Sequence, residues 1–147
     1  MDVAAAVMTP VLAVVALAVV ALGGWATARG VRSTELLPPL ALALVTTLIA
    51  VNKVGSPQFM AWLAVPVVFG IACSAAGQAS SFRVPALLTL ALAALTQLFY
   101  PYLYGHILGV EPAMIAVLTT RNALLFVLLA VAVRAMVRAP RGRRQAG

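Results

Sequence analysis

Five long apolar segments dominate this sequence, and their length constrains the fold more than any other feature. They cover residues 3–28, 36–51, 59–76, 84–104 and 112–136, and short polar links separate them. A helix that crosses a membrane needs about 20 apolar residues, because it rises about 1.5 Å per residue. The sequence therefore predicts an all-α polytopic membrane protein, with about five transmembrane helices forming one bundle over residues 1–136.

The composition excludes an ordinary water-soluble domain. The chain is 64% hydrophobic and only 9% charged, whereas a soluble domain carries about 25% charged residues. The formal net charge of +7 does not indicate a nucleic-acid partner, because the basic residues stand in short clusters beside the apolar segments. That distribution is typical of topology signals and of contacts with membrane lipid.

The distribution of arginine predicts an orientation. Eight of the ten basic residues lie in the link at residues 29–35, in the link at residues 77–83, or at and after the end of the fifth segment. By the positive-inside rule these regions face the cytoplasm. We therefore expect an extracytoplasmic N-terminus, a disordered basic cytoplasmic tail at residues 137–147, and a multi-pass location in the cell membrane. The first segment is expected to be a retained helix, since it is longer than the apolar region of a signal peptide.

Arg121 lies deep inside an apolar segment, far from either end, where charge is costly. It follows Pro112 by nine residues, which places it about 13 Å from the outer end of the fifth helix. Thr119, Thr120 and Asn122 offer it hydroxyl and amide partners. In that position a cation can line a cavity open to the outer leaflet. Alternatively, its long side chain reaches outward to the interface or bonds a helix carbonyl.

The link at residues 52–58 is the second candidate region. Lys53 lies on the same predicted side as Arg121, and together the two can hold a phosphate or pyrophosphate, since arginine offers a planar fork and lysine a point charge. Pro57 prevents a helix from passing straight through, and Gln58 opens the next one. A helix N-terminus beside Lys53 also favours an anion. Without this context, Lys53 is explained as an ordinary loop lysine.

The same region resembles a known motif. Its sequence is Asn52-Lys53-Val54-Gly55-Ser56-Pro57-Gln58-Phe59, with Trp62-Leu63 following. It resembles the Lys-[Val/Ile]-x-Ser-Pro-Gln-[Tyr/Phe]-x-x-Trp-Leu pattern of the family-87 polyprenol-phosphate-mannose-dependent mannosyltransferases, which are bacterial glycosyltransferases of the GT-C type. It is also similar to a stretch of the eukaryotic GPI mannosyltransferases. Residues 99–105 and 120–122 are similar to the last spans of the bacterial enzymes, so that the resemblance covers most of the chain from about Leu36 onward.

The resemblance implies transfer of a sugar, mannose in this family, from a polyprenyl-phosphate donor at the extracytoplasmic face. It implies that Lys53, Ser56, Gln58, Arg121 and Asn122 contact the phosphate or the sugar of that donor. The expected partners are therefore membrane lipid and the lipid-linked sugar donor, and no cofactor is expected.

The chain departs from that family in its acidic residues. The family uses a catalytic Asp in its first outer loop, whereas the acids here are Asp2, Glu35 and Glu111, none of them in such a motif. The chain is therefore expected to correspond to a C-terminal portion of such an enzyme, contributing the donor-phosphate subsite beside a missing N-terminal half or partner subunit. Its own catalysis stays open, and no catalytic residue is assigned. The alternatives are a non-enzymatic carrier or accessory subunit with an anion-binding cavity, and an inactive truncated product.

The aromatic residues are weaker candidates. Trp62, Tyr100 and Tyr104 can stack on a sugar ring, but aromatic belts at membrane interfaces explain them as well. His106 is the single histidine and Cys73 the single cysteine. No metal site is expected, because the outer loops supply too few further ligands.

Overall fold

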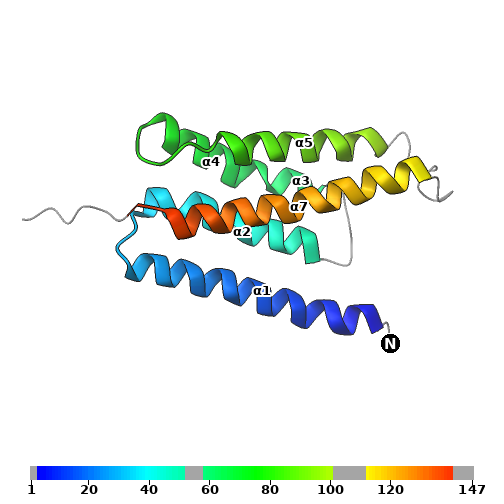
Figure 1. Ribbon diagram of the computed structural model, residues 1–147, viewed down its shortest axis with the longest axis horizontal. Coiled ribbons are helices and arrows are strands. Elements are labelled where there is room, and N and C mark those ends of the chain that lie inside the picture. The colour runs from blue at the N-terminus through cyan, green and yellow to red at the C-terminus, as the bar shows by residue number, and fades with distance from the viewer. Residues whose placement is uncertain (1–2, 52–57, 101–111, 141–147) are drawn as a thin grey trace, which may run out of the picture.

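The computed structural model describes residues 3–51, 58–100 and 112–140, and Figure 1 shows them as a bundle of helices. The helices are α1 (Val3–Ala28), α2 (Ser33–Val51), α3 (Phe59–Trp62), α4 (Ala64–Ala75), α5 (Arg83–Phe99) and α7 (Pro112–Arg138). The predicted all-α class is confirmed for this part of the chain. Lys53, Ser56 and Tyr104 lie outside the described residues.

Helices α2 and α7 form the centre of the bundle. They make the most extensive contact with each other, α1 packs against both, α4 packs on α2, and α5 packs on α7. In Figure 1, α1 lies on one side of this central pair, and α4 and α5 lie on the other. Figure 1 shows that α1, α2, α4, α5 and α7 run in alternating directions, as short connections between long helices favour, while α3 continues directly into α4.

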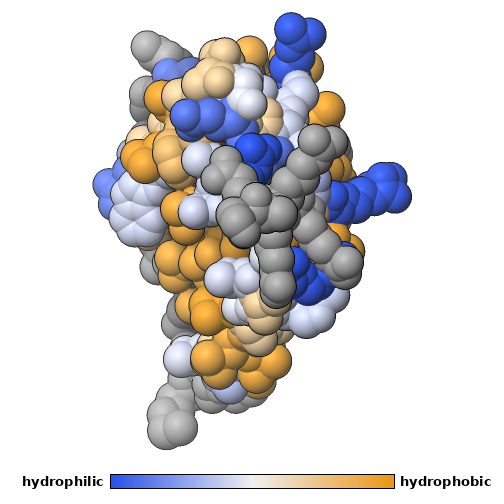
Figure 2. Space-filling view, turned by 90° about the vertical axis from the view of Figure 1, so that its left-hand side faces the viewer, coloured by the Kyte–Doolittle hydropathy of each residue, from blue (hydrophilic) through white to orange (hydrophobic). Residues whose placement is uncertain are grey.

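One end of the bundle carries a group of arginines, and we call it the basic end. It is the end at which α1, α4 and α7 finish and at which α2 and α5 begin. Figure 2 faces this end and shows hydrophilic side chains gathered over it, with hydrophobic residues around them. The arginines near it are Arg29, Arg32, Arg83, Arg134 and Arg138. Their predicted clustering at one end is confirmed, while the side of the membrane that this end faces stays a prediction.

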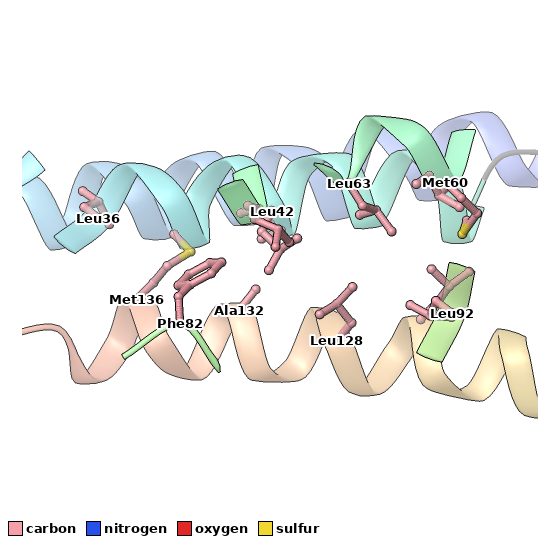
Figure 3. Close-up of a cluster of buried hydrophobic side chains, with 14 of the residues drawn as sticks. Leu36, Leu42, Met60, Leu63, Phe82, Leu92, Leu128, Ala132 and Met136 are labelled. Carbon is pink, nitrogen blue, oxygen red and sulfur yellow. The ribbon is translucent and has the colours of Figure 1, made fainter. Parts of the chain in front are cut away.

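The core lies between the central pair, α2 and α7, and the helices that flank it. Figure 3 shows side chains of α7, among them Leu128 and Ala132, directed toward Leu42 of α2. Phe82, Met136 and Leu36 extend this cluster toward the basic end, and further apolar residues continue it toward the opposite end. Between helices in lipid, such packing stabilises mainly through van der Waals contact, because lipid tails are as apolar as the side chains themselves.

Large apolar side chains also cover the outside of the bundle. Val14 and Leu17 on α1, Val65 on α4 and Leu90 on α5 are all mostly exposed. Three helices are long and apolar enough to cross a membrane, with apolar stretches at Val7–Ala28, Ser33–Val51 and Pro112–Arg138. These observations support a membrane protein, because water does not tolerate so large a continuous apolar surface.

The other two predicted spans are shorter helical regions, Phe59–Ala75 and Arg83–Leu98. The first is interrupted at Leu63, between α3 and α4. Pro66 has no amide hydrogen to donate to the carbonyl of Trp62, and the Leu63 amide donates to the Met60 carbonyl, a tighter turn than an α-helix makes. Five spans therefore stay a prediction, of which three have helices of sufficient length.

Helices α1 and α4 end in the same way at the basic end. Gly30 and Gly77 both have positive φ, of 78° and 68°. The amide of Val31 donates to the Ala26 carbonyl, and the amide of Gln78 donates to the Cys73 carbonyl. These are Schellman motifs, in which a glycine in the left-handed region satisfies the last carbonyls of a helix. They turn the chain sharply into α2 and into the loop before α5.

Candidate anion-binding site

Arg121 is buried between α7 and α5. Its side chain begins nine residues after Pro112, the first residue of α7, and only 4% of the residue is exposed. It contacts Thr96, which is three residues before the end of α5. Since α5 is the shorter helix, Arg121 is deep along α7 but close to the end of α5. The structure therefore buries this cation within the bundle, while the cavity open to the outer leaflet stays a prediction.

Two hydrogen bonds fix the guanidinium. Nε donates to Oγ1 of Thr96 at 3.3 Å, and Nη1 donates to Oδ1 of Asn122 at 3.1 Å. The Thr96 hydroxyl donates in turn to the Leu92 carbonyl at 2.8 Å. Because its single hydrogen is used there, its oxygen is free to accept from the arginine. Thr96 thus holds the guanidinium in place with a neutral acceptor.

The guanidinium keeps unused donors. Nη2 is buried and has no hydrogen-bond partner among the described residues. No carboxylate pairs with Arg121 in this part of the chain, where the recorded ion pair joins Arg32 to Glu35. A buried charge normally has both a counter-charge and filled hydrogen-bond positions. Among the described residues Arg121 has no counter-charge and its Nη2 has no acceptor, and carboxylate or phosphate oxygens are the acceptors that a guanidinium binds best.

Two neighbouring hydroxyls play a different part from the one that the sequence predicts. Thr119 and Thr120 are exposed, and their hydroxyls donate to the carbonyls of Ile115 and Ala116, each at 2.8 Å. The described hydrogen bonds of Arg121 go to Thr96 and Asn122 and not to these two residues, whose hydroxyls bond their own helix, as a helical threonine readily does. Asn122 does serve as a partner, as predicted.

Thr96 is the site residue that sequence analysis missed. It lies on the inward face of α5, on which Thr89 and Leu92 also lie. A threonine followed by Gln97 is a polar pair inside an otherwise apolar segment. That pair was the available signal, but nothing in the local pattern says which helix it meets, since the contact spans 25 positions in the chain.

The remaining candidates of the described region do not converge on the guanidinium. Gln58 directly precedes α3, as predicted. Its side chain is exposed and makes no capping hydrogen bond. Trp62 packs its ring against Phe59, with the centroids 4.8 Å apart. Tyr100 is exposed in extended backbone after α5. Their roles in binding a sugar stay predictions.

A second buried charge lies at the basic end. Glu35, near the start of α2, has a side chain only 8% exposed. It accepts a hydrogen bond from the Ser80 amide at 2.9 Å and one from the Ser80 hydroxyl at 3.3 Å, while Arg32 lies 3.7 Å from it. The loop before α5 is further joined to α2 by the Thr34 hydroxyl, which donates to the Gln78 carbonyl at 3.0 Å. Glu35 therefore joins the start of α2 to the loop before α5.

The described residues contain no group of three or more His, Cys, Asp or Glu side chains that can hold a metal ion. Comparison with protein-family models, with curated proteins and with solved structures finds no match for this chain.

Proposed function

We propose that this membrane protein binds the phosphate of a lipid-linked sugar at Arg121, and so supplies the donor subsite of a glycosyl transfer. One observation carries the proposal: a guanidinium only 4% exposed, held by neutral groups, whose Nη2 has no partner in the described part of the chain. A phosphate supplies both the counter-charge and the acceptors that this group lacks.

The lipid-linked form of the phosphate follows from the surroundings. Arg121 belongs to one of the helices long and apolar enough to cross a membrane. Exposed apolar side chains, including Ile115 and Phe126, lie on the same helix. A phosphate attached to a long apolar chain reaches such a depth from the bilayer side, whereas a free, fully hydrated phosphate pays a large desolvation penalty there.

The motif at residues 52–62 supports the sugar part of the proposal. Its resemblance to polyprenyl-phosphate-mannose-dependent mannosyltransferases motivates mannose as the sugar and Lys53 as a second cation. Gln58 opens α3, and α3 contacts α5, the helix that bonds Arg121. Helix α5 therefore contacts both α3, which follows the motif residue Gln58, and the side chain of Arg121.

The second candidate function is binding of the lipid phosphate without catalysis, and the surroundings of Glu35 favour it. Glycosyl transfer needs a base within hydrogen-bond reach of the acceptor hydroxyl. Glu35 is the one acidic residue in the described part of the chain, and it accepts hydrogen bonds from Ser80 at the basic end. An accessory subunit or carrier that binds the lipid phosphate needs no such base.

The test measures binding of polyprenyl-phosphate mannose to the purified chain in lipid nanodiscs. Arg121→Gln is expected to weaken binding by about tenfold to a hundredfold, because it removes a charged hydrogen-bond donor. Arg134→Gln, at an exposed arginine of the same helix, is the matched control and should bind as the wild type does. The neutral polyprenol should bind both forms equally weakly. Equal affinity of the phosphate ligand for wild type and Arg121→Gln would reject the proposal.

The same preparation separates the two candidates. Transfer of mannose to an added acceptor would indicate an enzyme, whereas tight binding without transfer would favour the accessory or carrier role. Lys53→Ala in parallel tests the second cation independently of Arg121.

A further inference from the structure

A pocket of about 210 Å³ opens at the basic end, away from Arg121. It lies between the start of α2, the start of α5 and the end of α7, and the loop before α5 forms one wall. Most of its surface is apolar, and two residues of opposite charge contribute to it. Its lining includes Glu35, Pro38, Pro39, Phe82, Pro85 and Arg138.

The two charges do not neutralise each other. Arg32 is the recorded ion-pair partner of Glu35 in the described residues, at 3.7 Å, and Arg138 makes no ion pair with it. Arg138 is the last residue of α7 and is exposed, whereas Glu35 is buried. The pocket is therefore lined by a buried acidic residue and, separately, by an exposed basic one. A ligand that carries both a positive and a negative group complements this arrangement.

The carboxylate has remaining capacity to accept hydrogen bonds. Ionised, it offers about four lone-pair positions, and the Ser80 amide and hydroxyl take two of them. The backbone carbonyls of Thr34 and Glu35 are further acceptors. The residues four positions later are Pro38 and Pro39, which have no amide hydrogen to donate to them. This turn of α2 is thus rich in acceptors, which suits a group with several N–H donors.

The apolar part of the pocket fits a lipid. Pro38, Pro39 and Pro85, together with the ring of Phe82, supply rigid apolar walls. The pocket lies at the basic end, where Figure 2 shows hydrophilic side chains beside hydrophobic ones. A headgroup is expected at such a boundary between polar and apolar surface, with its ester and the start of its chain against the apolar walls.

We propose that this pocket binds a phospholipid whose headgroup carries a primary amine, with the ammonium at Glu35 and the phosphate at Arg138. A primary ammonium has three N–H donors for the carboxylate and the neighbouring carbonyls. A quaternary ammonium has none, and an anionic headgroup without an amine meets the Glu35 charge unfavourably. The proposal is independent of the function proposed for Arg121.

The test compares phosphatidylethanolamine, phosphatidylcholine and phosphatidylglycerol with identical acyl chains. Each is titrated into the purified full chain, and native mass spectrometry counts the bound lipid. Phosphatidylethanolamine is expected to bind about tenfold more tightly than the other two, as a charged hydrogen bond provides. Equal binding of phosphatidylethanolamine and phosphatidylcholine, or tighter binding of phosphatidylglycerol, overturns the proposal without the need for any variant.

Variants then locate the selectivity. Glu35→Gln should reduce phosphatidylethanolamine binding to the level of phosphatidylcholine, and Arg138→Gln should weaken both, because both carry the phosphate. Ser80→Ala keeps the carboxylate and should keep the preference, so that it controls for loosening of the loop. Arg134→Gln, which does not line the pocket, should change nothing. A preference that survives in folded Glu35→Gln protein, or that is lost in Arg134→Gln, contradicts the assignment.

Discussion

Two buried charged residues toward opposite ends of the bundle have very different surroundings. Glu35 accepts two hydrogen bonds from Ser80 and has a guanidinium 3.7 Å away. Arg121 has two neutral partners and a terminal nitrogen with none in the described part of the chain. Because a buried charge needs both a counter-charge and filled hydrogen-bond positions, the fold accounts for Glu35 but not for Arg121. Glu35 thus has a structural role within the protein itself, whereas the described partners of Arg121 leave its charge uncompensated.

The largest expected change in unfolding free energy comes from disrupting the packing next to Glu35 at the basic end. A Cβ added at Gly70 of α4 would lie 2.4 Å from Cδ1 of Phe82, which is buried next to the Glu35 loop. We expect Gly70→Ala to destabilise the protein by about 2–3 kcal/mol, because the ring has to move out of its packed position. Reversible unfolding in mixed micelles measures the change. Gly24→Ala, where a Cβ meets nothing within 4 Å, is the matched control and should not destabilise.

The next largest change in unfolding free energy is expected from removing the buried carboxylate of Glu35. Glu35→Ala leaves the Ser80 amide without its acceptor, and we expect a loss of about 2 kcal/mol in the same unfolding measurement. Glu35→Gln retains one acceptor oxygen and should lose less. If both variants unfold like the wild type, Glu35 does not hold the loop to α2, and the contrast with Arg121 disappears.

Much of the fold could be predicted from hydropathy alone. The limits of α1 follow directly from an apolar segment bounded by Arg29, and the start of α3 after Gln58 follows from Pro57. The start of α2 was predicted at residue 36, whereas the helix begins at Ser33. The reason is that the amides of Glu35 and Leu36 both bond the Arg32 carbonyl, so the polar link becomes the first helical turn.

The partners in both charged sites were beyond the reach of the sequence pattern. The importance of Arg121 followed from the cost of a charge in an apolar segment. Its bond to Thr96 depends on which face of α5 meets α7, and the contact of Glu35 with Ser80 spans 45 positions in the chain. Such contacts are set by helix packing, which a pattern of apolar residues restricts without specifying.

A smaller effect of opposite sign is expected at Arg121. Arg121→Met replaces a poorly satisfied buried charge by an apolar side chain of similar length, and Thr96 keeps its bond to the Leu92 carbonyl. We therefore expect a gain of about 1 kcal/mol in unfolding free energy, together with loss of phosphate binding. Arg134→Met, at an exposed position, should leave unfolding almost unchanged. A clear loss of stability in Arg121→Met would mean that the arginine is structural, like Glu35.

The smallest effect concerns the ion pair at the basic end. Arg32 has a side chain 55% exposed, and its nitrogen lies 3.7 Å from the Glu35 carboxylate. Exposed pairs of this kind contribute little, so Arg32→Gln should cost less than about 0.5 kcal/mol. Double-mutant cycles measure the coupling free energies directly. The coupling of Glu35 to Ser80 should exceed its coupling to Arg32 and should persist at high salt. The reverse order would make Glu35 one half of an ion pair, and the contrast with Arg121 would then depend on the counter-charge rather than on hydrogen bonds.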